Sequence, residues 1–308
     1  MKILKPKFWD IDYHFFSFAL YPFSLLYRLL IFIKKNTTKT KKFPIPIICV
    51  GNIYLGGTGK TPLAIKTFEI LKKLNKNPVV IKKNYQNHKD EVLLLKNYSR
   101  VLLAKNRAEG ILEAIKKKFD CVILDDGFQD FEIKKNLNIV CFHNKQKIGN
   151  GFTIPSGPLR ETLQSLKYCD IVFLNGSKDL NFENKLKKYN KQLKFFYYNY
   201  KTKNIDVFKN KKLIAFAGIG NPENFFDFLR MNHLNIIKEV NYPDHFEYSE
   251  KELDLLSKME KQYKAKLITT EKDYLRINPI FRKRVNYVPV KVDFDENNFK
   301  NILEKFIQ

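Results

Sequence analysis

The sequence predicts an α/β fold, with one parallel sheet covered by helices on both faces and a second, smaller α/β domain after it. Short apolar runs typical of buried parallel strands recur along the chain, and helical stretches lie between some of them. A glycine-rich loop that ends in Lys60-Thr61 separates the first such run from a helix. An aromatic, almost uncharged segment precedes both. These observations predict a nucleotide-binding sheet with an additional element at the N-terminus.

The composition is that of a globular protein with an unusual charge. The chain has 308 residues, of which 44% are hydrophobic and 29% charged, which is enough for a large core and more natural for two domains than for one. The net charge of +24 is extreme. It indicates either a polyanionic partner, such as nucleic acid or an anionic membrane, or a solvated lysine-rich surface. Charge alone does not decide between them.

The cysteines predict a reducing compartment. Cys49, Cys121, Cys141 and Cys169 have no C-x-x-C spacing, and none lies near a histidine in a metal-ligand pattern. Three of them fall in strand-like apolar runs, so we expect buried thiols and a cytosolic protein.

Residues 1–43 are predicted to form an amphipathic, membrane-associated helix and a basic linker. The uncharged run Phe15–Tyr27 is shorter than the roughly 18 residues that a membrane span needs. A narrow polar stripe follows helical spacing, and several lysines come after it. The stripe consists of Ser17, Tyr21, Ser24 and Arg28. This pattern favours a helix lying on an anionic membrane surface over a buried core helix, and a membrane span is a less favoured alternative that stays open.

The alternating pattern begins at residue 44. Ile45–Val50 is strand-like, the glycine-rich loop follows, and "TPLAIKTFEILKKLNK" has the spacing of a helix. Further strands are predicted in "NPVVIKK", "YSRVLLA", "DCVILDD", "NIVCFH" and "DIVFLN". From about 177 to 210 no periodicity is clear, and a second alternating block follows. We therefore expect a P-loop kinase-like domain over 44–205 and a smaller α/β domain over 206–308.

The loop "GNIYLGGTGKTP" predicts a nucleotide site although Tyr54 replaces the first glycine of the usual P-loop pattern. Backbone N–H groups at a helix N-terminus bind phosphate, and glycine permits the positive φ angles that such a loop needs. The residues expected to bind ATP are Gly56, Gly57, Thr58, Gly59, Lys60 and Thr61. Lys60 would reach the β- and γ-phosphates, and Thr61 would ligate Mg²⁺.

A second acidic strand completes the prediction of a P-loop NTPase-like fold. "FDCVILDDGFQD" ends a buried strand with Asp125 and Asp126. Two adjacent buried carboxylates are costly unless a cation or donor pairs with them, so both are candidate Mg²⁺ ligands, and which one touches the metal stays open.

Six segments in order give the chain a specific resemblance. They are "GNIYLGGTGKTP", "LDDGFQD", "GNGFTIPSGPLRE", "FAGIGNPENFF", "PDHFEY" and "ITTEKD". The order resembles that of the tetraacyldisaccharide 4′-kinase family of lipid A biosynthesis, from about residue 10 to the C-terminus. The resemblance implies transfer of the γ-phosphate of ATP to the 4′-hydroxyl of a tetraacyldisaccharide 1-phosphate, with Mg²⁺. It also implies two α/β domains with the active site in the cleft between them, and a location on the cytoplasmic face of the bacterial inner membrane.

The family's residues can be carried over position by position. The resemblance implies a catalytic base at Asp90 in "KDEV", with Glu91 beside it, and a histidine that orients the base at His245. Arg160 and Glu161 match a motif near the phosphates and acceptor, and Tyr85 matches a kept tyrosine on the acceptor side. Catalytic roles thus fall on Asp90, His245, Lys60 and Arg160, and substrate contacts on Glu91, Tyr85 and Glu161.

Several positions depart from the family pattern. Its Ser-Arg-Gly-Tyr-Gly segment is "KKNYQ" here, with Lys83 for Arg and Asn84 for Gly, and the stretch before Asp90 is short. Lys89 replaces the glycine before Asp90, and Asp130 stands where the family often has histidine. Because Asp90 and His245 fall in different predicted domains, we expect their hydrogen bond to form fully only when the cleft closes on substrate.

Two other classes of protein remain as alternatives. A membrane-associated ATPase of the partitioning type has a similar loop, but it usually carries a lysine where this chain has Leu55, and it lacks the "IPSGPLRE" segment. A nucleic-acid-binding ATPase would fit the charge, but no zinc, RRM or helix-turn-helix signature supports it, so no nucleic acid is expected. The oligomeric state stays open.

Overall fold

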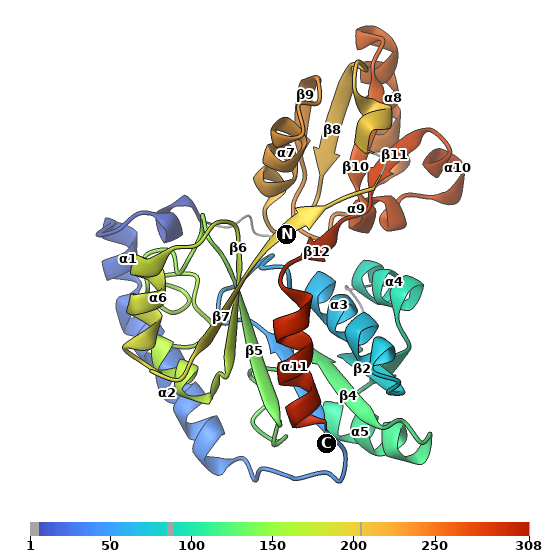
Figure 1. Cartoon of the computed structure of the whole chain (residues 1–308). Helices are drawn as coiled ribbons and strands as arrows, with labels where there is room; N and C mark the ends of the chain where they lie inside the picture. Colours follow the sequence, from blue (N-terminus) through green and yellow to red (C-terminus); the bar gives the residue numbers. More distant parts are fainter. Residues whose placement is uncertain (1–5, 85–88, 204, 308) are drawn as a thin grey trace. The chain divides into compact units, whose positions relative to one another are not determined.

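The computed structural model describes residues 6–84, 89–203 and 205–307 (Figure 1). Contact clustering divides the chain into two compact units. The larger comprises 5–84, 98–199 and 292–308, and the smaller comprises 1–4, 85–97 and 200–291. We call them the P-loop unit and the inserted unit.

The larger sheet has eight strands in the order β12-β7-β6-β5-β1-β4-β2-β3. From β7 to β3 every neighbouring pair is parallel, as predicted for this α/β fold. Its strands are β1 (Ile47–Gly51), β2 (Pro78–Lys83), β3 (Val101–Ala104), β4 (Cys121–Asp125), β5 (Leu137–His143), β6 (Ile171–Asn175), β7 (Lys194–Lys201) and β12 (Lys291–Asp293). The central strands are buried along their whole length, which explains why they read as continuous apolar runs. All four cysteines are buried and free, as expected.

Helices connect and cover these strands. Helix α3 packs on β1, β2 and β4, α5 packs on β2, β3 and β4, and α11 packs on α3. The helical segments around this sheet are η1 (Lys7–Asp10), α1 (Phe15–Ala19), α2 (Tyr21–Thr37), α3 (Lys60–Lys73), α5 (Arg107–Lys116), η2 (Leu163–Tyr168), α6 (Leu180–Lys187) and α11 (Glu296–Phe306). Among the described helices none is long and apolar enough to cross a bilayer.

The smaller sheet has four parallel strands in the order β11-β10-β8-β9. They are β8 (Leu213–Ala217), β9 (Ile236–Asn241), β10 (Lys266–Thr270) and β11 (Val285–Val288). Two hydrophobic clusters pack on it, one around Phe226 and one around Leu256. The helices of this unit are α4 (Lys89–Tyr98), η3 (Ile205–Phe208), α7 (Pro222–Met231), α8 (Glu250–Tyr263), α9 (Glu271–Arg276) and α10 (Pro279–Arg282).

The units differ from the predicted boundaries of 44–205 and 206–308 at two places. Residues 85–97, which carry α4, group with 200–291, and 292–308, which carry α11, return to the P-loop unit. The stretch without clear periodicity also contains structure, namely α6 and β7. Asp179 caps α6, and β7 alternates between half-buried, buried and exposed residues, a weaker signal than a wholly apolar run.

Candidate functional site

The glycine-rich loop has the geometry that phosphate binding requires. Gly56 has a φ of 124° and Gly59 a φ of 83°, which only glycine adopts readily, and α3 begins at Lys60. Asn52, which is fully buried, holds the loop from inside: its Nδ2 donates to Gly56 O at 3.2 Å and to Thr58 Oγ1 at 2.9 Å. The loop thus leads directly into the N-terminus of α3, where helices leave backbone N–H groups available for phosphate.

Tyr54, the departure from the P-loop pattern, is a core residue. Its side chain is 1% exposed, and its backbone forms an isolated bridge with Leu159. Leu55 N also donates to Pro158 O at 2.8 Å. The position lies outside the tight part of the loop, so a side chain replaces glycine there without blocking the phosphate site.

Asp125 lies at the end of β4 beside Thr61. Thr61 Oγ1 donates to Asp125 Oδ2 at 3.4 Å, and the carboxylate is fully buried. The other oxygen, Oδ1, has no hydrogen-bond partner among the described residues. Lys82, at the end of β2, places its Nζ 2.5 Å from Oδ2. The sequence analysis did not single out Lys82, and the only signal is a lysine that ends an otherwise apolar strand.

Asp126 contacts two basic side chains that the sequence predicts for the site, Lys60 of the loop and Arg160. Lys60 Nζ lies 3.6 Å from Asp126 Oδ1, and Arg160 Nη1 donates to both carboxylate oxygens at 2.9 and 3.1 Å. Burial opposes ionisation, but the charges of Lys60 and Arg160 outweigh it and hold the pKa of Asp126 well below its usual value. Asp126 is thus already paired, and it has a left-handed backbone with a φ of 59°.

Arg107 is a further cation that the sequence analysis missed. It is 7% exposed, and its Nη2 donates to Asp125 O at 3.2 Å and Asp126 O at 2.7 Å. Its Nη1 lies 3.4 Å from Asp130, the residue that departs from the family's histidine. Arg107, in the first turn of α5, thereby fixes the backbone of the acidic pair.

Thr61 and Asp125 fit a Mg²⁺ ion better than Asp126 does. Asp125 offers a buried oxygen without a partner beside the hydroxyl of Thr61, whereas both oxygens of Asp126 bind Arg160. No cluster of three or more His, Cys, Asp or Glu side chains suited to a metal occurs within the described residues. Mg²⁺ is commonly held by one or two carboxylates together with substrate phosphates.

Asp90 and His245 form a second cluster, in the inserted unit. His245 Nδ1 lies 3.1 Å from Asp90 Oδ1, and Arg276 Nη2 donates to Oδ2 at 2.6 Å. Asp90 is 3% exposed. Burial opposes its ionisation, but the hydrogen bond with His245 and the charges of Arg276 and Lys272 hold the pKa of Asp90 well below its usual value.

Contact clustering groups Asp90 and His245 in one unit, whereas the sequence predicts them in different domains. Both lie in the inserted unit, because α4 groups with residues 200–291. Their hydrogen bond therefore lies within one unit rather than across two predicted domains. A hydrogen bond from His245 N to Gly218 O at 3.0 Å, with a φ of 54° at His245, fixes the backbone that presents the imidazole.

Glu91 is paired with a lysine, and Glu161 is buried. Glu91 Oε1 lies 2.6 Å from Lys272 Nζ within the inserted unit. Glu161, in the P-loop unit, is 5% exposed, and burial raises its pKa. Tyr85 lies outside the described residues.

Helices α1 and α2 bury polar side chains and expose apolar ones, the reverse of a core helix. Of the predicted polar stripe, Ser17 and Ser24 are fully buried. Ser24 Oγ lies 2.8 Å from both Thr153 O and Ser156 Oγ, and Asn150 Nδ2 donates to Ser17 Oγ at 2.9 Å. Ser17 and Ser24 therefore pack on the segment that leads to Arg160, whereas Arg28 of the stripe is exposed.

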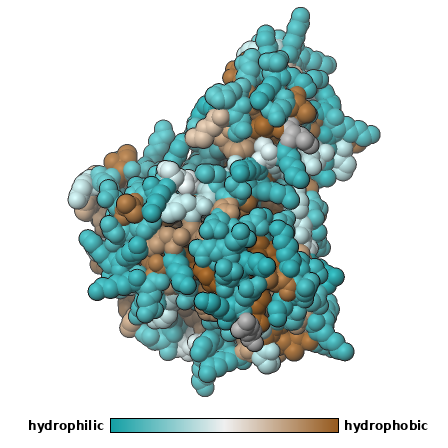
Figure 2. Space-filling view, viewed as in Figure 1, coloured by the Kyte–Doolittle hydropathy of each residue, from teal (hydrophilic) through white to brown (hydrophobic). Residues whose placement is uncertain are grey.

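The apolar face of these helices is exposed instead. Phe15 is 76% and Phe23 61% exposed, and the same face carries further large apolar side chains. They are Phe16, Phe18, Leu25, Leu26, Leu29, Leu30, Phe32 and Ile33. Apolar groups show as brown at the left edge of the space-filling view, over the region of η1 and α1 (Figure 2). A patch of this extent on a soluble surface marks an interaction site.

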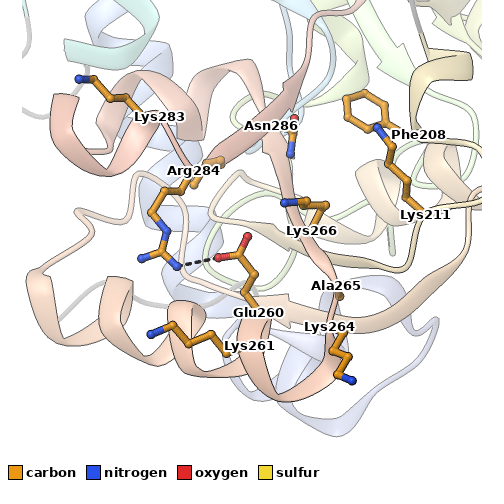
Figure 3. Close-up of a pocket in the computed structure, with 11 residues that line it drawn as sticks. Phe208, Lys211, Glu260, Lys261, Lys264, Ala265, Lys266, Lys283, Arg284 and Asn286 are labelled. Atoms are coloured by element: carbon orange, nitrogen blue, oxygen red, sulfur yellow. Dashed lines mark hydrogen bonds and ion pairs between the residues drawn. The ribbon is translucent and has the colours of Figure 1, made fainter.

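A hollow of about 740 Å³ in the inserted unit does not belong to either cluster. Its wall is basic, with Lys266 and Arg284 among its residues, and none of the predicted site residues lines it. Arg284 is engaged with Glu260 at 2.8 Å, and the lysine side chains point in different directions rather than toward one centre (Figure 3). The hollow therefore lacks the convergent groups of a binding site.

Comparison with known proteins identifies relatives over nearly the whole chain. The family model described as tetraacyldisaccharide-1-P 4′-kinase matches residues 16–308. The tetraacyldisaccharide 4′-kinase of Pelagibacter ubique is 44% identical, covering 99% of this chain and 98% of its own. That of Rickettsia felis is 34% identical, covering 100% and 98%. Among solved structures, LpxK from Aquifex aeolicus in complex with ATP has a TM-score of 0.72 at 24% identity, covering 95% of this chain and 99% of its own, which shows the shared fold.

Proposed function

The chain belongs to the tetraacyldisaccharide-1-P 4′-kinase family, and on that premise we propose that it transfers the γ-phosphate of ATP to the 4′-hydroxyl of a tetraacyldisaccharide 1-phosphate. The observation that carries the proposal is the loop Gly56–Lys60, preformed at the start of α3 and followed by the acidic pair at the end of β4. The partitioning ATPase is not favoured, because the kinase family accounts for residues 16–308.

The P-loop unit supplies the nucleotide chemistry. The loop N–H groups and Lys60 bind the phosphates, and Arg160, held 2.9 Å from Asp126, adds positive charge. Thr61 and Asp125 would hold Mg²⁺, which would neutralise charge on the β- and γ-phosphates. Phosphoryl transfer depends chiefly on such positioning and neutralisation.

The inserted unit supplies the candidate base. Asp90 is ionised at neutral pH, because its pKa is held low, and it is fixed on both oxygens by His245 and Arg276. A positioned carboxylate can accept the proton of the attacking hydroxyl. Glu91 and Glu161 remain candidates for substrate contacts.

The exposed apolar face of α1 and α2 supports a peripheral position on the cytoplasmic face of the inner membrane. The acceptor is a lipid, and Lys34, Lys35 and Lys39 follow the apolar face, where anionic headgroups would attract them. Tyr27 Oη donates to Arg160 O at 2.9 Å, so the same helix that would lie in the membrane is bonded to the backbone of a candidate catalytic residue.

The test is an ATP-dependent transfer assay on a tetraacyldisaccharide 1-phosphate in detergent micelles, with product read by mass. We expect the acceptor to gain one phosphate with the wild type and none with Lys60→Ala. ATP hydrolysis without transfer, stimulated equally by lipids of unrelated structure, would contradict the kinase assignment.

A further inference from the structure

Lys82 is a buried cation at the centre of the nucleotide site. Strands β2 and β4 are neighbours, with Ile81 opposite Leu124, so Lys82 and Asp125 come side by side at the carboxyl ends of their strands. Lys82 is 3% exposed and Asp125 fully buried, and Nζ lies 2.5 Å from Oδ2. A lysine this deep among central strands is costly to bury unless its charge is paired, and Asp125 is the partner here.

The ammonium stands where a metal ion would be held. The oxygen that binds Lys82, Asp125 Oδ2, is also the one that accepts from Thr61 Oγ1 at 3.4 Å. Thr61 is the P-loop hydroxyl that would ligate Mg²⁺. Lys60, in contrast, lies against Asp126. Lys82 thus pairs with Asp125 and Lys60 with Asp126. Of these two lysines, Lys82 is the one that contacts the oxygen bonded to Thr61.

We propose that Lys82 is a resident counter-ion of Asp125 that excludes divalent cations from Thr61 and Asp125 until nucleotide phosphates are present. The inference rests on the proposed function for the identity of the nucleotide site. A divalent ion beside an ammonium in a low-dielectric site is repelled, whereas triphosphate oxygens attract both cations. The flexible stem of lysine allows Nζ to move from the carboxylate toward the phosphates, which leaves Asp125 to the metal. Lys82 is therefore a positioning residue that makes metal binding depend on nucleotide.

The test compares metal binding by wild type and Lys82→Met without nucleotide. Methionine keeps most of the side-chain volume and removes the charge. We expect Mn²⁺, read by its paramagnetic resonance signal, to bind the variant at least about tenfold more tightly, because the repulsive charge is gone. Millimolar Mg²⁺ should raise the thermal midpoint of the variant by about 2–4 °C and leave that of the wild type unchanged.

Two controls separate this role from a structural one. Lys187→Met removes a lysine paired with Glu183 at 3.0 Å in the same unit and should give no Mg²⁺ response. The double variant Lys82→Met with Asp125→Asn removes both charges, so it should recover stability relative to Lys82→Met without gaining the metal response. Equal Mn²⁺ affinity in wild type and Lys82→Met would overturn the proposal.

If Lys82→Met does not fold, Mn²⁺ binding by the wild type and by Asp125→Asn tests the proposal. Without nucleotide, we expect Mn²⁺ binding by the wild type to be weak and unchanged by Asp125→Asn. Tight binding that Asp125→Asn abolishes would overturn the inference. Failure of lipid phosphorylation would count against the proposed function alone, since these metal measurements use no acceptor.

Discussion

Arg276 and His245 bind different carboxylate oxygens of Asp90. Arg276 Nη2 lies 2.6 Å from Oδ2, and His245 Nδ1 lies 3.1 Å from Oδ1. Arg276 is itself fixed by Asp273 at 2.8 Å and by Gly218 O at 2.6 Å. The candidate base is therefore anchored by contacts within the inserted unit. Its orientation depends on a cation as much as on the imidazole.

Asp90 and His245 should act as one catalytic unit. Asp90→Asn and His245→Ala should each lower kcat by about 10²–10⁴-fold, because a positioned base is lost or released, and the double variant should be little worse. Nucleotide affinity, measured by a fluorescent ATP analogue, should hardly change. Losses that multiply in the double variant would assign the two residues separate roles and make Glu91 the next candidate base.

The stability supplied by Asp90 should depend on pH with a definite sign. Its folded-state pKa is lower than that of the unfolded chain, about 3.9, so its contribution is fully present above that pH and is lost as pH falls toward the folded value. The difference in thermal midpoint between wild type and Asp90→Asn should therefore be constant from pH 5 to 8, within about 1 °C, and shrink below pH 4. A difference that grows on acidification would contradict the ion-paired assignment.

Lys60→Ala should abolish phosphoryl transfer and leave the fold intact. We expect kcat/KM to fall by at least about 10²-fold, as when one transition-state donor is removed. Asp126 keeps its contacts with Arg160 at 2.9 and 3.1 Å, so the acidic pair is not left uncompensated and the circular dichroism spectrum should be unchanged. Near wild-type turnover in a folded variant would refute the P-loop assignment.

Membrane binding should follow the apolar face of α2. Phe23→Glu with Leu26→Glu should weaken binding to anionic vesicles by at least about 10²-fold, because burying each side chain is worth about 1.5–3 kcal/mol. Ile280→Glu, at a site 84% exposed in the inserted unit, is the matched control and should leave binding unchanged. Cosedimentation with vesicles measures both.

Deletion of residues 1–33 is a less clean form of the same test. The truncated chain should be more soluble and lose activity on lipid micelles more than on a short-chain acceptor. It would also remove Ser24, which binds Thr153 and Ser156, so some loss of activity would follow from disturbance near Arg160. Equal vesicle binding by full-length and truncated protein would exclude the membrane role.

Ser24→Ala should destabilise the P-loop unit. Ser24 Oγ accepts from Ser156 N at 3.0 Å, so alanine leaves this buried N–H group without its acceptor, at about 1–3 kcal/mol, while Thr153 O keeps the bond from Gly157 N. Thr37→Ala, an exposed hydroxyl bonded to Ile33 O at 2.9 Å in the same helix, should cost far less. Urea unfolding monitored by circular dichroism distinguishes the two.

The sequence predicted the parallel sheets because their strands are uninterrupted apolar runs, which leave little choice of structure. Strand β7 escaped prediction since its lysines, asparagine and tyrosines mix buried with exposed positions. At the site, Lys60, Asp125 and Asp126 follow from local pattern. Arg276 does not, because its partner Asp90 lies 186 positions away and only the fold joins them.

Contact clustering divides the chain differently from the predicted domains for a related reason. Local patterns follow chain order, so residues 85–97 were placed with their sequence neighbours rather than with 200–291. Lys82 illustrates the same limit on a smaller scale. A lysine at the end of a strand is usually solvated, and its 3% exposure is a consequence of β4 lying beside it.

Helix α11 determines when the P-loop unit can be completed during synthesis. Phe299 and Leu303 are fully buried, Phe299 lies 5.2 Å from the ring of Phe173, and Glu296 binds Lys66 of α3 at 2.5 Å. These side chains leave the ribosome only after the whole inserted unit has emerged. Until then the nascent chain exposes the apolar surface that α11 later covers, although most of the nucleotide-binding sheet is translated first.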